Sequence, residues 1–200
     1  MALIESFSGI RGIYKKDLTE DIAIRYAFAF AQVLREKKQN LKVVIGRDTR
    51  ESGENLRMSI IEGLDCDILD VGPLPTAAIE NAIREYNADA GIIITASHNE
   101  PEYNGFKFLD NDGAILRPKD IDKVITKFHE LSKLDEESFL SNHLYKKNKI
   151  EHVKRIAKVE KDALILYKKF ILKFLSKKDR KIIKNSKIKV IIDPNGGTGI

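Results

Sequence analysis

The sequence is short of cysteine and of long apolar segments, and each shortage excludes a class of protein. Cys66 is its one cysteine among 200 residues, so no disulfide can form within the chain. No uninterrupted apolar run approaches the roughly 20 residues of a membrane-spanning helix. Residues 1–4 are followed at once by Glu5, well short of the apolar core of a secretory signal. Together these absences predict a cytoplasmic protein without a membrane partner.

What the sequence does contain is sufficient for a folded core. Its hydrophobic content is 42% over 200 residues, which suits one or two ordinary domains. The formal net charge of +5 is compatible with nucleic acid and equally with anionic metabolites. Much of the excess positive charge lies between Lys168 and Lys189, so its position matters more than its size.

Two kinds of apolar pattern alternate along the first 131 residues. Segments with helical spacing follow three candidate N-caps, which are Thr19, Ser52 and Thr76. Short apolar runs typical of buried strands lie between or after them, at residues 41–45, 67–71 and 91–94. A hairpin is expected over residues 103–116, and a helix over residues 118–131. The alternation predicts an α/β fold: a layered α/β/α domain over residues 1–131 with a mixed, mostly parallel sheet.

The remaining residues predict the start of a second, similar domain. Residues 132–149 are polar and lack a clear period, which is typical of a connector. A helix with a packed apolar face is expected next, because apolar residues recur at helical spacing at Leu164, Tyr167, Ile171, Phe174 and Leu175. Residues 189–193 predict a strand that enters a glycine-rich turn. We expect residues 150–200 to begin a second domain, and the chain to be the amino-terminal part of a longer protein.

The run at residues 91–94 ends in three polar residues that could carry chemistry, Ser97, His98 and Asn99. In open α/β sheets, ligands gather beyond the carboxyl ends of such strands. A hydrolase elbow is not expected, because it needs glycines two residues on either side of the serine. His98 is a poor direct base for its neighbour, since adjacent side chains diverge in extended chain. The three residues either carry chemistry or only cap the strand and satisfy loop amides.

Four cations are predicted at strand ends or in loops, namely Arg11, Arg47, Arg50 and Lys107. Their charge suits a phosphorylated ligand and a developing phosphoryl transition state. Gly9 and Gly12 bracket the first of them and permit close approach of either a ligand or another strand. A serine that handles phosphate therefore explains the group better than a hydrolytic serine.

These residues carry a resemblance to a known family. Residues 95–99, followed by the Tyr-Asn-Gly-Phe-Lys run at residues 103–107, resemble the active-site signature of the α-D-phosphohexomutases, the phosphoglucomutase and phosphomannomutase family. Residues 8–12 resemble the family's opening motif, and residues 46–50 its second motif. Residues 193–199 resemble the start of its second domain. The resemblance thus extends along the whole chain in order.

The resemblance implies an isomerase that interconverts hexose 1-phosphate and hexose 6-phosphate. Ser97 would carry a phosphoryl group, pass it to the sugar and take back the other phosphate from a hexose 1,6-bisphosphate intermediate. Mg²⁺ would be held by an oxygen of the Ser97 phosphate and three aspartates. Arg11 and Lys107 match catalytic residues close to the transferring phosphate, with Lys107 in proton transfer or charge neutralisation. His98 matches a residue that positions the reacting groups, and Asn99 is expected to bind substrate phosphate beside it.

The sequence departs from the family pattern at the serine motif, where Glu100 replaces the usual proline, and at Ser6-Phe7, where a Gly-Thr pair is common. The family's aspartate-rich metal loop, sugar-selecting loop and second phosphate-binding loop correspond to positions beyond residue 200. We therefore expect the 200-residue chain alone to be inactive. An alternative is a non-catalytic sugar-phosphate or nucleotide-binding module. Nucleic acid is not an expected partner, because the lysine-rich run has few aromatic residues for base stacking.

Overall fold

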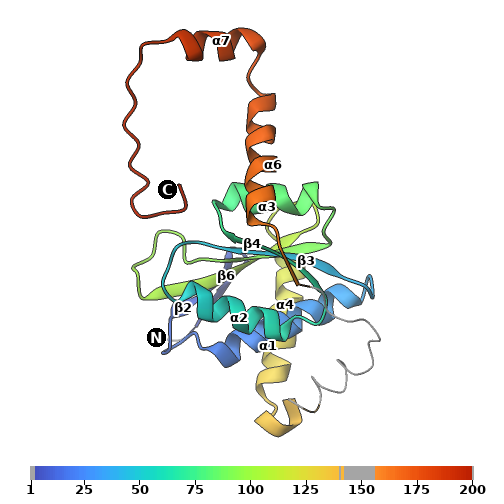
Figure 1. Ribbon diagram of the computed structural model, residues 1–200. Helices are drawn as coiled ribbons and strands as arrows, with labels where there is room; N and C mark the ends of the chain where they lie inside the picture. Colours follow the sequence, from blue (N-terminus) through green and yellow to red (C-terminus); the bar gives the residue numbers. More distant parts are fainter. Residues whose placement is uncertain (1–2, 140, 142–155, 200) are drawn as a thin grey trace.

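A seven-stranded mixed sheet forms the centre of the molecule (Figure 1). The computed structural model describes residues 3–139, 141 and 156–199. The strands lie in the order β1-β2-β6-β5-β3-β4-β7. Their bounds are Ile4–Ser6 for β1, Gly9–Ile13 for β2, Lys42–Arg47 for β3, Asp67–Pro73 for β4, Ala90–Ile94 for β5, Tyr103–Asp110 for β6 and Ile156–Lys158 for β7.

The predicted α/β fold with a mixed sheet is confirmed, and its two halves pair differently. The strand β3 pairs in parallel with β4 and β5, and β4 pairs in parallel with β7. The pairs β1–β2, β2–β6 and β5–β6 are antiparallel. Parallel pairing therefore makes up half of the sheet rather than most of it, because the chain returns as a direct neighbour after β5.

Helices cover both faces of the sheet, as the α/β/α prediction requires (Figure 1). One face packs against α1 (Glu20–Arg35), α2 (Gly53–Gly63) and α4 (Pro118–Ser132). The other packs against α3 (Thr76–Glu85) and α6 (Glu160–Lys173). Because strand side chains alternate, Ile92 and Ile94 of β5 enter the first core and Ile93 enters the second. A strand buried on both faces accounts for the unbroken apolar run in the sequence.

Of the three predicted helix caps, one forms. Thr19 caps α1, since its hydroxyl accepts a hydrogen bond from the Ile22 amide at 3.3 Å. Ser52 stands at the cap position of α2 but makes no capping bond; its hydroxyl instead accepts from Asn104 at 2.8 Å, which ties α2 to β6. Thr76 is the first residue of α3, with Pro75 at the cap position, and it does not cap that helix.

The predicted hairpin and the helix after it are present. The β6 strand turns at residues 111–113, where Gly113 has a φ of +80°. Beyond the turn, Ile115 forms an isolated antiparallel bridge with Leu109. The helix α4 then begins with Pro118, a favoured residue at the first helical position.

The predicted connector begins as part of the first core. Residues 136–139 are helical, and Phe139 is 3% exposed. Its ring meets Phe28 edge-on at 5.8 Å, and the Arg25 guanidinium lies 4.2 Å from its centroid. The expected connector over residues 132–149 thus includes a short helical segment that packs on the first core through Phe139, and its role as a connector stays a prediction. Residues 140 and 142–149 lie outside the described residues, and the proposed division at residues 131 and 150 stays a prediction.

The helix predicted over residues 164–175 is present as α6, but its buried side differs from the expected one. Ala163 is buried and Tyr167 packs with it against α3. Leu164, Ile171 and Phe174 of the predicted apolar face are exposed, Phe174 by 73%. The prediction fails because only the first turns of α6 pack against α3 and the sheet. The helix then extends away from the sheet towards α7 (Lys177–Asn185) (Figure 1).

The strand predicted at residues 189–193 is not formed: within the described part of the chain these residues pair with no strand. Their apolar side chains are exposed, Ile191 by 97%. An apolar run becomes a strand only where a neighbouring strand satisfies its amides and carbonyls. The glycine-rich turn after it contacts the segment that follows β3, where Thr49 donates a 2.8 Å hydrogen bond to the Gly196 carbonyl. Among the described helices, none is long and apolar enough to cross a membrane.

Candidate active site

The serine loop, residues 95–102, joins β5 to β6 at the carboxyl end of the parallel strands. Ser97 lies in the loop with an exposed side chain and a φ of +58°. This left-handed backbone conformation is uncommon for a residue other than glycine, and it persists only where the surroundings hold it. The loop around the predicted nucleophile is therefore a constrained structure.

Thr95 fixes the base of the serine loop. Its hydroxyl donates to Asp48 at 2.7 Å and accepts from the Ser97 amide at 2.9 Å. Its own amide donates to the Gly105 carbonyl of β6 at 2.9 Å. With 6% of its surface exposed, Thr95 makes these bonds in a site that excludes most water. The entry of the loop is thus tied both to β6 and to the segment that follows β3.

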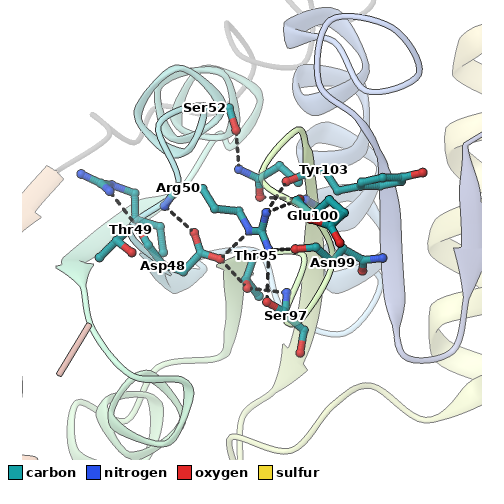
Figure 2. A network of polar contacts seen from close by, with 12 residues as sticks. Asp48, Thr49, Arg50, Ser52, Thr95, Ser97, Asn99, Glu100 and Tyr103 are labelled. Carbon is teal, nitrogen blue, oxygen red and sulfur yellow. Dashed lines mark hydrogen bonds and ion pairs between the residues drawn. The ribbon is translucent and has the colours of Figure 1, made fainter. Parts of the chain in front are cut away.

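Arg50 fixes the rest of the loop from the inside (Figure 2). Its guanidinium donates to four backbone carbonyls, those of Ser97 at 3.1 Å, Asn99 at 2.6 Å, Glu100 at 2.6 Å and Tyr103 at 3.0 Å. The Asp48 carboxylate accepts from the Arg50 Nε at 3.2 Å and from its amide at 3.0 Å. Arg50 is therefore committed to the protein itself, and the expectation that its charge serves a ligand is wrong.

Arg47 is also paired within the protein. Its guanidinium donates to the Asp48 carbonyl at 3.0 Å and lies 3.5 Å from the Glu54 carboxylate. It lines a pocket of about 160 Å³ in which Arg57 is hydrogen-bonded to Glu54 and, at 2.7 Å, to buried Asp70. This pocket lies beside the ends of β3, β4 and β7, and its lining includes no residue of the serine loop.

Arg11 and Lys107 are brought together on neighbouring strands, and they lie within β2 and β6 rather than at the strand ends or in the loops that the sequence predicted. Arg11 of β2 lies opposite Gly105 of β6, and Lys107 follows two residues later on the same face. A side chain at Gly105 would come within 3.1 Å of both the Arg11 Cγ and the Thr95 carbonyl, so glycine lets Arg11 lie close to the base of the loop. Neither cation forms a hydrogen bond or ion pair with the described residues.

Lys107 nevertheless has an acidic neighbour on α3. Burial raises the pKa of the Glu80 carboxyl, and the positive charges of Arg84 and Lys107 oppose that rise. Of the four cations that the sequence grouped, Arg11 and Lys107 are thus the two that remain available to an anion.

Of the two glycines around Arg11, Gly9 serves the approach of another strand. Gly9 has a φ of +128°, and a side chain there would come within 2.5 Å of the Phe106 carbonyl of β6. The two alternatives that the sequence left open, a ligand or a neighbouring strand, are decided for Gly9 by this contact. The same close packing of β2 on β6 places Arg11 beside Lys107.

His98 and Asn99 follow Ser97 in the serine loop and differ in exposure. The His98 side chain is exposed and has no hydrogen bond to the described residues. The Asn99 amide donates to the Ala96 carbonyl at 3.1 Å, while its side-chain Oδ1 is buried without a hydrogen-bond partner in the described structure. Their predicted roles in binding and positioning a phosphate stay predictions.

The described residues do not form a complete magnesium site. Among them, no group of three or more histidine, cysteine, aspartate or glutamate side chains could hold a metal ion. Asp48 lies at the base of the serine loop, but its carboxylate oxygens are engaged by Thr95 and Arg50. Ser97 alone would offer one oxygen. The three aspartates that the resemblance implies are not provided by this part of the chain.

Comparison with known proteins identifies the family to which this fold belongs. The sequence profile described as "Phosphoglucomutase/phosphomannomutase, alpha/beta/alpha domain I" matches residues 4–135. A phosphoglucomutase/phosphomannomutase of Thermococcus kodakarensis is 37% identical over 195 residues, and a phosphoglucosamine mutase of Clostridioides difficile is 40% identical over 130 residues. A crystal structure of a family protein from Burkholderia thailandensis covers 78% of this chain with a TM-score of 0.56 and 26% identity. The chain belongs to the phosphoglucomutase/phosphomannomutase family, and the resemblance seen in its motifs is confirmed.

The match extends over a limited share of each relative. The chain covers 39% of the length of the Thermococcus protein, 29% of the Clostridioides protein and 33% of the Burkholderia chain. The alignment with the Thermococcus protein includes 96% of this chain, and so reaches beyond the profile of domain I.

Proposed function

We propose that this chain is the catalytic-serine part of a phosphohexomutase, which interconverts hexose 1-phosphate and hexose 6-phosphate through a phosphoserine. The observation that carries the proposal is the constrained, exposed Ser97, together with two cations on the neighbouring strands, Arg11 and Lys107, that form no hydrogen bond or ion pair with the described residues. The names of the relatives, phosphoglucomutase/phosphomannomutase and phosphoglucosamine mutase, support this class of reaction.

In the proposed reaction, Ser97 carries a phosphoryl group on its Oγ. A hydroxyl of the sugar monophosphate attacks the phosphorus, the bond to Oγ breaks, and a hexose 1,6-bisphosphate forms. The hydroxyl loses its proton as the new bond forms, and Oγ gains a proton. Arg11 and Lys107 would stabilise the charge on the transferring group, with Lys107 also a candidate for proton transfer. Transfer of the sugar's other phosphate to Ser97 completes the isomerisation.

His98 and Asn99 would bind and orient the sugar phosphate. Magnesium, when bound, would supply further stabilisation of phosphoryl charge. One of its ligands would be the phosphate oxygen on Ser97, and the others would come from outside the described residues. We further propose a cytoplasmic location for the protein, in keeping with its hexose phosphate substrate.

The test is transfer of labelled phosphate from a hexose 1,6-bisphosphate to Ser97 in the presence of Mg²⁺. One sample holds the chain alone, and a second also holds the portion of the Thermococcus relative that lies beyond the aligned region. The glucose, mannose and glucosamine bisphosphates are compared, because the relatives' names differ in the hexose. Label on Ser97 in either sample supports the proposal, whereas label elsewhere, or in neither sample, contradicts it.

Ser97→Ala separates an enzyme from a non-catalytic binding module. In an enzyme the substitution abolishes labelling and isomerisation, because the atom that accepts the phosphoryl group is gone. A module that only holds sugar phosphates through its cations would keep most of its affinity for them. Affinity is measured by titration calorimetry on the same preparations.

A further inference from the structure

Arg50 lies at the centre of the polar network under the serine loop, where one side chain satisfies four carbonyls of one short segment. A guanidinium suits this task because it is planar and presents five donors in a fixed fork, whereas a lysine offers a single compact ammonium. Hydrogen bonds from a charged donor are also stronger than those between neutral groups. The loop is thus built around the cation, with its carbonyl oxygens turned inwards.

The orientation of Arg50 is itself fixed by the end of β3. Asp48 holds the Arg50 Nε at 3.2 Å, and the same carboxylate oxygen accepts from the Thr95 hydroxyl at 2.7 Å. The Asp48 amide in turn donates to the Ile94 carbonyl, the last of β5, at 3.0 Å. The position of the guanidinium is therefore fixed through Asp48, which is itself held by the end of β5 and by Thr95 at the base of the loop.

The consequence for Ser97 is that the peptide groups on both sides of its Cα are fixed. Its amide donates to the Thr95 hydroxyl and its carbonyl accepts from Arg50. With both groups held, the left-handed conformation at a φ of +58° is imposed on the residue. Its side chain points away from the guanidinium (Figure 2), which leaves the hydroxyl exposed in a defined direction.

We propose that Arg50 is a positioning residue for phosphoryl transfer: from beneath the loop it holds Ser97 in the conformation that presents Oγ to the substrate. This role rests on the proposed function of Ser97 and assigns Arg50 no contact with the sugar phosphate. Misplacing a reacting group by about 1 Å can lower a rate by about 100-fold. Loss of the guanidinium should therefore slow labelling of Ser97 by about that factor.

The first measurement reads the position of the loop and does not need activity. Hydrogen exchange is followed in the chain at the Ser97, Asn99 and Tyr103 amides, each of which donates within the serine loop segment. We expect Arg50→Ala to raise their exchange rates about tenfold, given the strength of bonds to a charged group, and to leave β5 protected. Arg84→Ala is the matched control, because Arg84 donates to one carbonyl of an exposed turn, that of Asp112, at 2.8 Å.

A second variant and a rescue experiment keep the test decisive if Arg50→Ala folds poorly. Arg50→Lys keeps a cation and should protect the loop only partly, since it cannot reach four carbonyls at once. Millimolar guanidinium ion should restore loop protection in Arg50→Ala, and should have no such effect in Arg84→Ala. Loss of protection in β5 together with the loop in both Arg50 variants would show a general folding role and would overturn the proposal.

The second measurement is the rate of Ser97 labelling in the wild-type protein and the three variants. Labelling that is about 100-fold slower in Arg50→Ala and normal in Arg84→Ala supports the positioning role. Equal labelling rates in the wild type and Arg50→Ala overturn it, as does unchanged exchange at Ser97 and Asn99. If the wild type itself accepts no label, the proposed function fails, and the exchange rates still decide whether Arg50 fixes the loop.

Discussion

Two isoleucine-rich segments of this chain have opposite fates. In β5 the run that leads to the serine loop is buried on both faces, and Ile94 is fully enclosed. In residues 188–192 a run of the same character is exposed, Ile191 by 97%. The segments differ little in composition but greatly in surroundings, since β5 lies between β3 and β6 while residues 189–193 pair with no described strand. Whether an apolar run forms a strand therefore depends on the strands available beside it, and not on its own composition.

The two regions also differ in how far they depend on other parts of the polypeptide. The polar contacts that hold the serine loop come from residues 48–105, all within the domain I match. The exposed apolar side chains of α6, α7 and the segment after them have no comparable support among the described residues. The serine loop is therefore held by contacts within the domain I match, whereas these exposed apolar side chains lack such support among the described residues.

The largest expected contrast is between two phenylalanines, one in each region. Phe108 of β6 is 1% exposed within the first core, and Phe108→Ala should lower the free energy of unfolding by about 3–5 kcal/mol, through lost burial and the cavity left behind. Phe174 is 73% exposed, and Phe174→Ala should change it by less than about 0.5 kcal/mol. Both changes in the free energy of unfolding are measured by urea titration, with circular dichroism as the signal. Similar losses in the two variants would show that Phe174 is packed in solution.

A smaller contrast is expected between two threonine hydroxyls. Thr95→Val removes the bonds to Asp48 and to the Ser97 amide in a buried site and should cost about 1–3 kcal/mol. Thr49→Val removes the bond to the Gly196 carbonyl at an exposed site, and an effect within about 0.5 kcal/mol is expected. Both free energies come from urea titrations. If Thr49→Val proved as costly as Thr95→Val, the glycine-rich turn would be anchored to the body far more firmly than this single bond implies.

The sequence predicted the body of the fold well, because its signals there are local and agree with the packing. The residues 91–94 run, the Thr19 cap and the glycine turn at residues 111–113 all have the predicted structure. The prediction failed where a residue's structure depends on a contact with a residue far away in the sequence. Ser52 looks like a cap, but Asn104 from a distant strand takes its hydroxyl.

In the candidate site, too, the features predicted correctly are local, and those missed depend on distant contacts. The motif pointed to Ser97, whose role stays a prediction, and the pairing of β2 with β6 brings Arg11 beside Lys107. Charge alone could not separate these two cations from Arg47 and Arg50, which the fold pairs internally. The one signal for the role of Arg50 is the aspartate two residues before it, and its four carbonyl partners lie about fifty residues away in the chain.

A pH-dependent contrast is expected where the two regions join, in the pocket lined by Glu54, Arg57, Asp70 and the start of α6. The hydrogen bond from Arg57 lowers the pKa of Glu54. A lowered pKa in the folded state contributes stability above the ordinary value of 4.5, and this contribution disappears as the pH falls through the lowered pKa. Glu54→Gln should thus reduce stability slightly at pH 7, by about 0–1 kcal/mol at this half-exposed site, and flatten the decline on acidification. The pH dependence of stability is measured by thermal unfolding of the wild type and Glu54→Gln between pH 7 and pH 3. Parallel curves of stability against pH for the two proteins would contradict the prediction.

The smallest effect on stability, and the most direct test of the exposed region, is expected for the paired change Ile191→Ser and Ile192→Ser. Both side chains are largely exposed, so the free energy of unfolding should stay within about 0.5 kcal/mol of the wild type. Clustered exposed apolar residues favour association, so binding of an apolar dye and concentration-dependent light scattering should both fall. Lys187→Ser, in the same segment, is the control that alters charge and removes no apolar surface. Unchanged dye binding together with a marked loss of stability in the isoleucine variant would mean that the segment packs on the body, and the contrast with β5 would disappear.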